Sequence, residues 1–334
     1  MSLNKTKVPN PDWLSKLSIY SASHNGRAVW QLSNTIVPYF ILWAAMIFLL
    51  KHNYSIWFFL CAAIPAGGLL VRIFILFHDC CHGSLFTSKK TNRLAGYITG
   101  ILTFTPFDEW RRAHIIHHAA SGNLDKRGVG DVWTMTVKEY KAAGRTERLA
   151  YRLFRNPLIM FGLGPFFLFL YIMRRSAPES KKAERRSVYL TNFVILVIIA
   201  AMGWLIGYKT FFQIQLPVLF TAGMIGIWLF YIQHQYENTY WTRSKEWNLL
   251  DSALNGSSYY KLPRILQWIT GSIGFHHIHH LRPRIPNYYL EQCCKNIPAL
   301  NETAPLTLLT SLRSIRLNLW DEDKNKLVGF NAVK

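Results

Sequence analysis

Four long stretches of the chain carry no charged residue, and they come in two closely spaced pairs. The first pair covers residues 28–50 and 52–71, and the second covers residues 187–208 and 210–236. Each stretch is rich in Leu, Ile, Phe and Val and has the roughly 20 residues that an α-helix needs to cross a hydrocarbon core of about 30 Å. Because a single lysine separates the members of each pair, the pattern predicts two helical hairpins in a membrane.

The fold class that follows is an all-α integral membrane protein with four transmembrane helices. We expect these helices at about residues 30–50, 54–77, 188–208 and 211–233. Two shorter uncharged runs, residues 94–107 and 156–173, are ambiguous. A crossing by the second run would place the basic segment 174–186 on the opposite side from the other basic residues. We therefore expect both runs to be interfacial or re-entrant, with a buried helix in the polar part as the alternative.

The excess of positive charge supports this topology. The chain has 38 Lys and Arg against 18 Asp and Glu, a formal net charge of +20, and only Lys51 and Lys209 lie in the two hairpin turns. The positive-inside rule then predicts that both termini lie in the cytoplasm. Residues 78–186 and 234–334 should form a cytosolic helical cap, within one domain spanning residues 1–334. The basic residues are scattered and accompany no recognition motif, so we exclude nucleic acid as a partner.

Nine of the twelve histidines fall into three motifs and one further position. An H-x-x-x-H motif follows the second span, two H-x-x-H-H motifs lie in the cap, and one histidine ends the fourth span. Positions i, i+3 and i+4 of a helix turn towards a common side, so each motif should gather its imidazoles. The nine are His78, His82, His114, His117, His118, His234, His276, His279 and His280. We expect His24 and His52 to be structural, and the spacing points His277 away from the shared face.

Imidazoles without thiolates suit Fe, Cu, Zn or Ni. Nine ligands are too many for one ion, so the pattern predicts two metals, each with four or five protein ligands and a free position. No catalytic side chain is expected beyond these ligands. Acidic residues near the motifs could orient the imidazoles or simply lie on the surface. The main candidates are Asp79, Asp131 and Glu237, and Asp108, Glu109 and Asp125 are the others.

The position of the histidines limits the chemistry. His78 and His234 end predicted spans, so a metal centre there would lie where a lipid chain can reach it. An unactivated methylene has no acidic proton and no electrophilic carbon, so acid–base or nucleophilic catalysis by side chains has nothing to act on. Oxygen activated at a metal is the reasonable route.

The order of the histidine motifs resembles that of the membrane fatty acid desaturases. The stretches around His78–His82, His117–Trp133 and Tyr231–Trp241 resemble the bacterial acyl-lipid desaturases, over about residues 70–285. The resemblance implies two iron ions held by the nine histidines, with O2 as co-substrate. It also implies a cis double bond introduced into a phospholipid or other acyl lipid, with release of two waters. Electrons would come from a ferredoxin, flavodoxin or cytochrome b5-type donor.

Two departures and two alternatives accompany this resemblance. Cys81 stands where many relatives have Gly in the first motif, and the chain has neither an H-P-G-G segment nor an iron–sulfur cysteine pattern, so the donor must be a separate protein. The alternatives are a hydroxylase or ketolase of the same superfamily, acting on a carotenoid, alkane or sterol, and a His-rich metal transporter. A transporter would place its ligands near the bilayer midplane. Near the chain end, apolar residues at helical spacing predict an amphipathic helix over residues 306–319.

Overall fold

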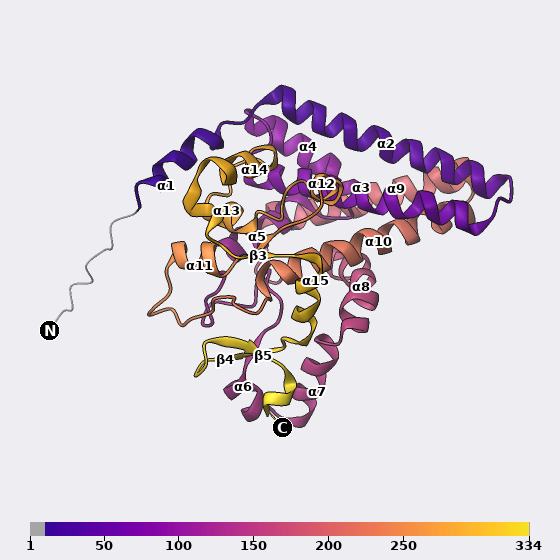
Figure 1. Ribbon diagram of the computed structural model, residues 1–334. Coiled ribbons are helices and arrows are strands. Elements are labelled where there is room, and N and C mark those ends of the chain that lie inside the picture. The colour runs from indigo at the N-terminus through magenta and orange to yellow at the C-terminus, as the bar shows by residue number, and fades with distance from the viewer. Residues whose placement is uncertain (1–10, 334) are drawn as a thin grey trace.

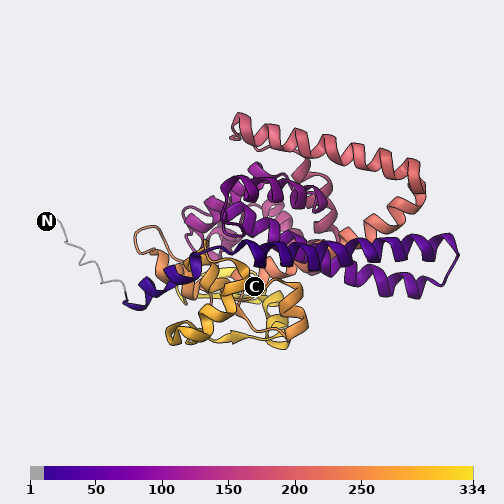
Figure 2. The same ribbon diagram turned by 90° about the horizontal axis from the view of Figure 1, so that it is seen from above.

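The computed structural model describes residues 11–333 and is mainly helical (Figure 1). Four of its helices are long and apolar enough to cross a membrane, which confirms the predicted fold class. They are α2 (Asn25–Lys51), α3 (Ile56–His82), α9 (Lys182–Ile206) and α10 (Tyr208–His234). Figures 1 and 2 show that they form two hairpins whose turns lie at the same end of the molecule. The predicted cytoplasmic placement of the two chain ends concerns residues 1–10 and 334, which lie outside the described residues.

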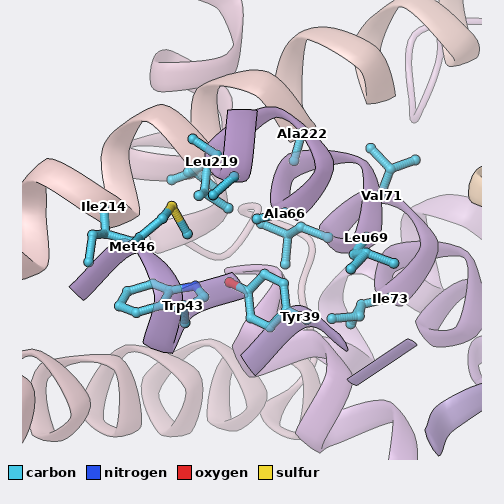
Figure 3. Close-up of a cluster of buried hydrophobic side chains, with 14 of the residues drawn as sticks. Tyr39, Trp43, Met46, Ala66, Leu69, Val71, Ile73, Ile214, Leu219 and Ala222 are labelled. Atoms are coloured by element: carbon cyan, nitrogen blue, oxygen red, sulfur yellow. The ribbon is translucent and has the colours of Figure 1, made fainter. Parts of the chain in front are cut away.

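The two hairpins meet through their second helices. Helices α3 and α10 pack closely at Gly67, where a Cβ atom would lie 2.6 Å from Cβ of Thr221. Helix α2 adds Tyr39, Trp43 and Met46 to the same buried cluster (Figure 3). Helix α9 stands apart from the other spans in Figure 2, and large apolar side chains on it are exposed. The outward faces of α2 and α9 are therefore the surfaces that lipid would cover.

A shorter helical hairpin lies between the spans and the cap. Helix α4 (Lys89–Leu102) begins at Ser88, whose side chain accepts a hydrogen bond from the Thr91 N–H, and it packs against α3 and α9. Helix α5 (Phe107–Ala120) returns after a short turn. The run 94–107 thus forms the end of α4, a turn and the start of α5. None of the candidate spans in the described residues includes it.

The second ambiguous run also bends. Helix α7 (Arg145–Phe154) is followed by a π-helical stretch η2 (Leu158–Leu163), α8 (Gly164–Leu170) and a 3-10 turn η3 (Ile172–Arg174). The segment from Leu158 to Arg174 is bent by 62° relative to α7, as expected for a broken or re-entrant element.

The remaining cap consists of short elements around the spans' inner ends. Its helical elements are α1 (Trp13–Lys16), η1 (Leu17–Ser21), α6 (Val137–Ala142), α11 (Leu249–Asn255), α12 (Arg264–Ile269), α13 (His276–Leu281), α14 (Asn287–Asn296), η4 (Pro298–Asn301), α15 (Leu308–Ser311), η5 (Leu312–Arg316) and η6 (Phe330–Val333). Strand β1 (Met135–Thr136) pairs in parallel with β4 (Leu319–Asp321), which pairs antiparallel with β5 (Lys326–Val328). Strand β2 (Tyr259–Tyr260) pairs in parallel with β3 (Pro305–Leu306).

The predicted amphipathic helix over residues 306–319 is wrong. Only Leu308–Ser311 is α-helical, a 3-10 turn follows, and Leu319 begins strand β4. The side chains of Leu319 and Trp320 are fully buried in two separate clusters, Leu319 with Tyr151 and Trp320 with Trp241, and β4 pairs with a strand on each side. This long-range pairing overrides the local helical spacing.

Candidate metal centre

Two spans end in histidines of the predicted ligand set. His78 and His82 lie one turn apart at the end of α3, and Gly83 ends that helix in the left-handed conformation (φ 66°) that glycine adopts without strain. His234 is the last residue of α10. These three imidazoles are therefore fixed by the rigid ends of membrane helices.

The two H-x-x-H-H motifs lie on α5 and α13, and each motif is shared between two groups of ligands. His114 and His118 join one group while His117 joins the other, and His276 and His280 lie opposite His279 in the same way. The expectation that each motif turns to one common point is therefore wrong. At 3.6 residues per turn, positions i+3 and i+4 differ by about 100° around the helix, so they diverge onto two neighbouring sites.

The structure brings all nine predicted histidines together, in one group of five and one of four. In each group the potential ligand atoms lie within 4.8 Å of one another. The two groups adjoin, because the rings of His118 and His280 stack across them with centroids 4.1 Å apart. The group of five contains His78, His82, His114, His118 and His279, and the group of four contains His117, His234, His276 and His280.

The contacts within each group fit a cation better than hydrogen bonds alone. The Nε2 atom of His118 lies 3.0 Å from Nε2 of both His114 and His279, and Nε2 of His234 lies 3.1 Å from Nε2 of both His117 and His276. One ring nitrogen cannot share a single proton with two such neighbours at once. Imidazole–metal bonds of about 2.1 Å at right angles would place adjacent nitrogens about 3.0 Å apart.

Burial keeps these imidazoles in the form that binds metals. Desolvation, and then repulsion from neighbouring imidazoles, lowers the pKa of His114, His118, His276, His279 and His280 well below the ordinary value. Neutral imidazoles retain a lone pair for a metal. The buried Nε2 atom of His280 has no hydrogen-bond partner among the described residues, as fits a ring nitrogen that can bind a metal.

Two acidic residues and one carbonyl orient the ring nitrogens that face away from the groups. The Asp131 carboxylate lies 2.6 Å from Nδ1 of His117, and the Gly256 carbonyl accepts a 2.9 Å hydrogen bond from Nδ1 of His234. Asp79 lies 3.3 Å from Nδ1 of His78 and accepts hydrogen bonds from Asn287 at the start of α14. Protons held on Nδ1 leave Nε2 of each ring free to bind a metal.

The structure contradicts the same role for Glu237. Its side chain is exposed on the loop after α10, and it makes no hydrogen bond to a histidine in residues 11–333. The other acidic candidates also pair elsewhere: Asp108 binds Arg93 and Tyr97, Glu109 binds Arg112 and Ser180, and Asp125 binds Arg243.

The three histidines outside the predicted ligand set, His24, His52 and His277, lie in structural positions. The side chain of His24 accepts a hydrogen bond from the Arg27 N–H at the start of α2, and His52 follows the end of that helix. His277 is buried on the far side of α13, where its Nε2 lies 3.1 Å from the Leu300 carbonyl.

A mainly apolar cavity of about 320 Å³ lies between the spans and extends to the histidines at their ends. Its walls come from α3, α8 and α10, including Phe74, Phe169 and Leu219, and its lining includes His78, His114 and His276. These histidines belong to both metal-ligand groups. An extended apolar molecule could therefore lie against both groups while most of its length stays inside the spans.

Comparison with known proteins agrees with this geometry. The family model described as "Fatty acid desaturase" matches residues 54–308. A fatty acid desaturase of Bacillus subtilis is 47% identical over 91% of this chain and 86% of its own length.

The chain belongs to the fatty acid desaturase family.

More distant relatives of this desaturase have more specific names. An endoplasmic reticulum omega-3 fatty acid desaturase of Vigna radiata is 27% identical, covering 73% of this chain and 66% of its own length. The sn-1 acyl-lipid omega-3 desaturase (ferredoxin) of Synechocystis is 27% identical, covering 71% of this chain and 66% of its own length. The chain is therefore an enzyme of the desaturase type and a multi-pass membrane protein.

The sequence analysis missed three groups that support the site. Trp110 stacks on the His114 ring with centroids 4.3 Å apart, and its position one turn earlier on α5 is a signal that could have revealed it. Asn287 and the Gly256 carbonyl are distant from the motifs in sequence, and no local pattern marks them.

Proposed function

We propose that this desaturase introduces a cis double bond into an acyl chain of a membrane lipid, with O2 as oxidant and two electrons from a separate donor. The observation that carries the proposal is the apolar cavity whose lining reaches both histidine groups. A ferredoxin-type donor is supported by the name of the Synechocystis relative, an acyl-lipid omega-3 desaturase (ferredoxin). Flavodoxin and cytochrome b5-type donors would provide the same electrons.

The nine histidines are the proposed iron ligands, five on one ion and four on the other. Iron held there would supply the activation of O2 that removal of hydrogen from an unactivated methylene requires. Asp131 keeps the proton of His117 on Nδ1, and the Gly256 carbonyl does the same for His234. The ligand atoms are thus held in place before substrate arrives, and no side chain needs to act as acid or base on the substrate.

The cavity orients the acyl chain. Its walls are apolar, so an acyl chain would displace water from it and leave the polar head of the lipid outside. The chain would pass His78 and His114, with Trp110 beside them in the cavity wall. The polar by-products, two waters, would form at the inner end of the spans, close to the cap.

The Bacillus subtilis relative and the distribution of charge support a location for the enzyme. We propose a bacterial inner-membrane protein, because that relative comes from a bacterium. Its cap and termini would lie in the cytoplasm, because Lys51 and Lys209 are the only basic residues at the hairpin turns. The chain would act as one domain. A soluble electron donor could then dock on the cap while the lipid enters from the bilayer.

Expression in a host that lacks polyunsaturated lipids tests this proposal. Total lipids are converted to fatty acid methyl esters and weighed by mass spectrometry, for the wild type, His118→Ala and His24→Ala. New esters that are two hydrogens lighter should be present with the wild type and His24→Ala, and absent with His118→Ala. Unchanged acyl chains with iron bound to the wild type would contradict the proposal, and esters heavier by one oxygen would indicate a hydroxylase.

A further inference from the structure

A short cap helix lies against the membrane half of a span. Helix α12 packs on α3, where Cγ2 of Ile269 would lie 3.4 Å from a Cβ atom at Gly68. Just after α12, Gly271 approaches Ile75 so closely that a Cβ atom would lie 2.8 Å from it. These contacts lie three to ten residues before His78, or about 5–15 Å along the axis of α3 towards the bilayer. Helix α12 therefore lies beside the half of α3 that leads to the histidines.

A buried arginine fixes α12 in this position. The Arg72 side chain of α3 is 3% exposed, donates to the Trp268 carbonyl and to Thr35, and lies over the Trp268 ring at 4.2 Å. Trp268 is nevertheless 41% exposed. Arg72 thus holds a half-exposed tryptophan at the level where tryptophans of membrane proteins concentrate.

Strand pairing brings a second apolar segment beside α12. Tyr260 of β2 lies opposite Leu306 of β3, and the Lys261 N–H donates to the Leu306 carbonyl at 2.8 Å. Because the two strands are parallel, the chain segments that follow them leave the pair at the same end. One segment leads into α12 and the other into α15 and η5. Figure 1 shows α12 and α15 at the side of the cap that adjoins the spans.

Both segments expose large apolar side chains, and exposed basic residues lie beside them in sequence. We call it the α12–α15 surface. Its apolar members are Ile265, Leu266, Trp268, Leu308, Leu309 and Leu312, of which Leu309 is 80% and Ile265 is 74% exposed. The exposed basic residues beside them in sequence are Lys261, Arg264, Arg313 and Arg316.

We propose that the α12–α15 surface lies on the cytoplasmic leaflet and inserts its apolar side chains at the boundary between headgroups and acyl chains. The partner is an anionic phospholipid surface, whose phosphates would bind the four basic residues. Apolar side chains flanked by Lys and Arg are typical of segments that lie in the membrane interface. Helix α12 also packs directly on α3, one of the four candidate membrane spans. A protein partner would have to displace lipid from this position.

Depth measurement by fluorescence quenching tests the proposal in the full-length protein. Cys61 is the only exposed cysteine among the described residues, so Cys61→Ala removes the background. Single cysteines are then introduced as Ile265→Cys and Leu309→Cys and labelled with an NBD fluorophore. Trp204→Cys on α9 is the membrane-embedded reference, and Lys326→Cys on β5 is the matched aqueous control. Each variant is placed as one copy per nanodisc, with a nitroxide near the top of the lipid acyl chains.

The proposal predicts that labels at residues 265 and 309 are quenched at least about two-fold more than the label at residue 326. Quenching no greater than at residue 326 would overturn it. Replacing phosphatidylglycerol by phosphatidylcholine, or combining Arg313→Glu with Arg316→Glu, should reduce the quenching at residue 309. An unchanged value would overturn the assignment of the basic residues to lipid phosphates. The measurement needs no turnover, so its failure would leave the proposed function standing.

Discussion

The hydrogen bond between Asp131 and His117 allows the support of the metal centre to be tested without removing a ligand. Both side chains are at most 5% exposed, and the carboxylate oxygen lies 2.6 Å from Nδ1. In Asp131→Asn the side chain keeps its size but loses its charge, and its amide can face Nδ1 with either N–H or oxygen. The imidazole would then no longer be held with its proton on Nδ1 and its Nε2 lone pair towards His234.

Removing such a partner typically costs 10–100-fold in metal affinity or activity, which corresponds to about 1.4–2.7 kcal/mol. We therefore expect Asp131→Asn to lose iron at about 10–100-fold lower chelator concentration than the wild type, with a matching loss of desaturation. Iron per chain is measured by mass spectrometry of the purified protein, and desaturation by analysis of fatty acid methyl esters. Asp125→Asn is the control, because Asp125 binds Arg243 on the surface. Full iron binding and full desaturation in Asp131→Asn would refute the reasoning.

Three further predictions test the site, the structural histidine and the cavity. His118→Ala should lose desaturation and bind less iron while inserting normally in the membrane, whereas His24→Ala should behave as the wild type. Activity of His118→Ala equal to that of the wild type would contradict the assigned metal site. His277→Ala should leave iron content unchanged but lower the unfolding free energy by about 1–3 kcal/mol, measured by denaturant titration, because the Leu300 carbonyl loses its imidazole partner. Gly226→Leu should lower desaturation at least about ten-fold at unchanged iron content, because its side chain would occupy the cavity. Gly162→Leu is the control, because Gly162 is at an open position outside the cavity lining, and it should not lower desaturation. Equal turnover in the two variants would contradict the assigned cavity.

Local features of the sequence were sufficient to predict the spans. The length of an uncharged apolar run and the single lysine between two runs are properties of adjacent residues, and the two hairpins followed from them. The i, i+4 spacing of His78 and His82 likewise placed both imidazoles on one helix face. The spans can be predicted locally because, in a bilayer, every backbone N–H and C=O group must form its hydrogen bond within the same helix.

Long-range contacts explain what the sequence did not predict. Leu319 repeats at helical spacing with the residues before it, yet pairing with β1 and β5 makes it part of a strand. Glu237 lies close to His234 in sequence, but the chain turns outward after α10 and leaves it exposed. Asn287 supports Asp79 from 208 residues away. No local pattern encodes which distant segments meet at a site.

The central claim is that this protein removes hydrogen from an acyl chain of a membrane lipid at the nine-histidine site. Its most direct test is a reconstituted reaction with the purified protein, reduced ferredoxin, O2 and vesicles of phospholipid with fully deuterated acyl chains. The account predicts acyl chains that have lost two deuterium atoms, formed by the wild type but not by His118→Ala. Chains that gain an oxygen atom, or unchanged chains while iron is bound and ferredoxin is oxidised, would contradict it.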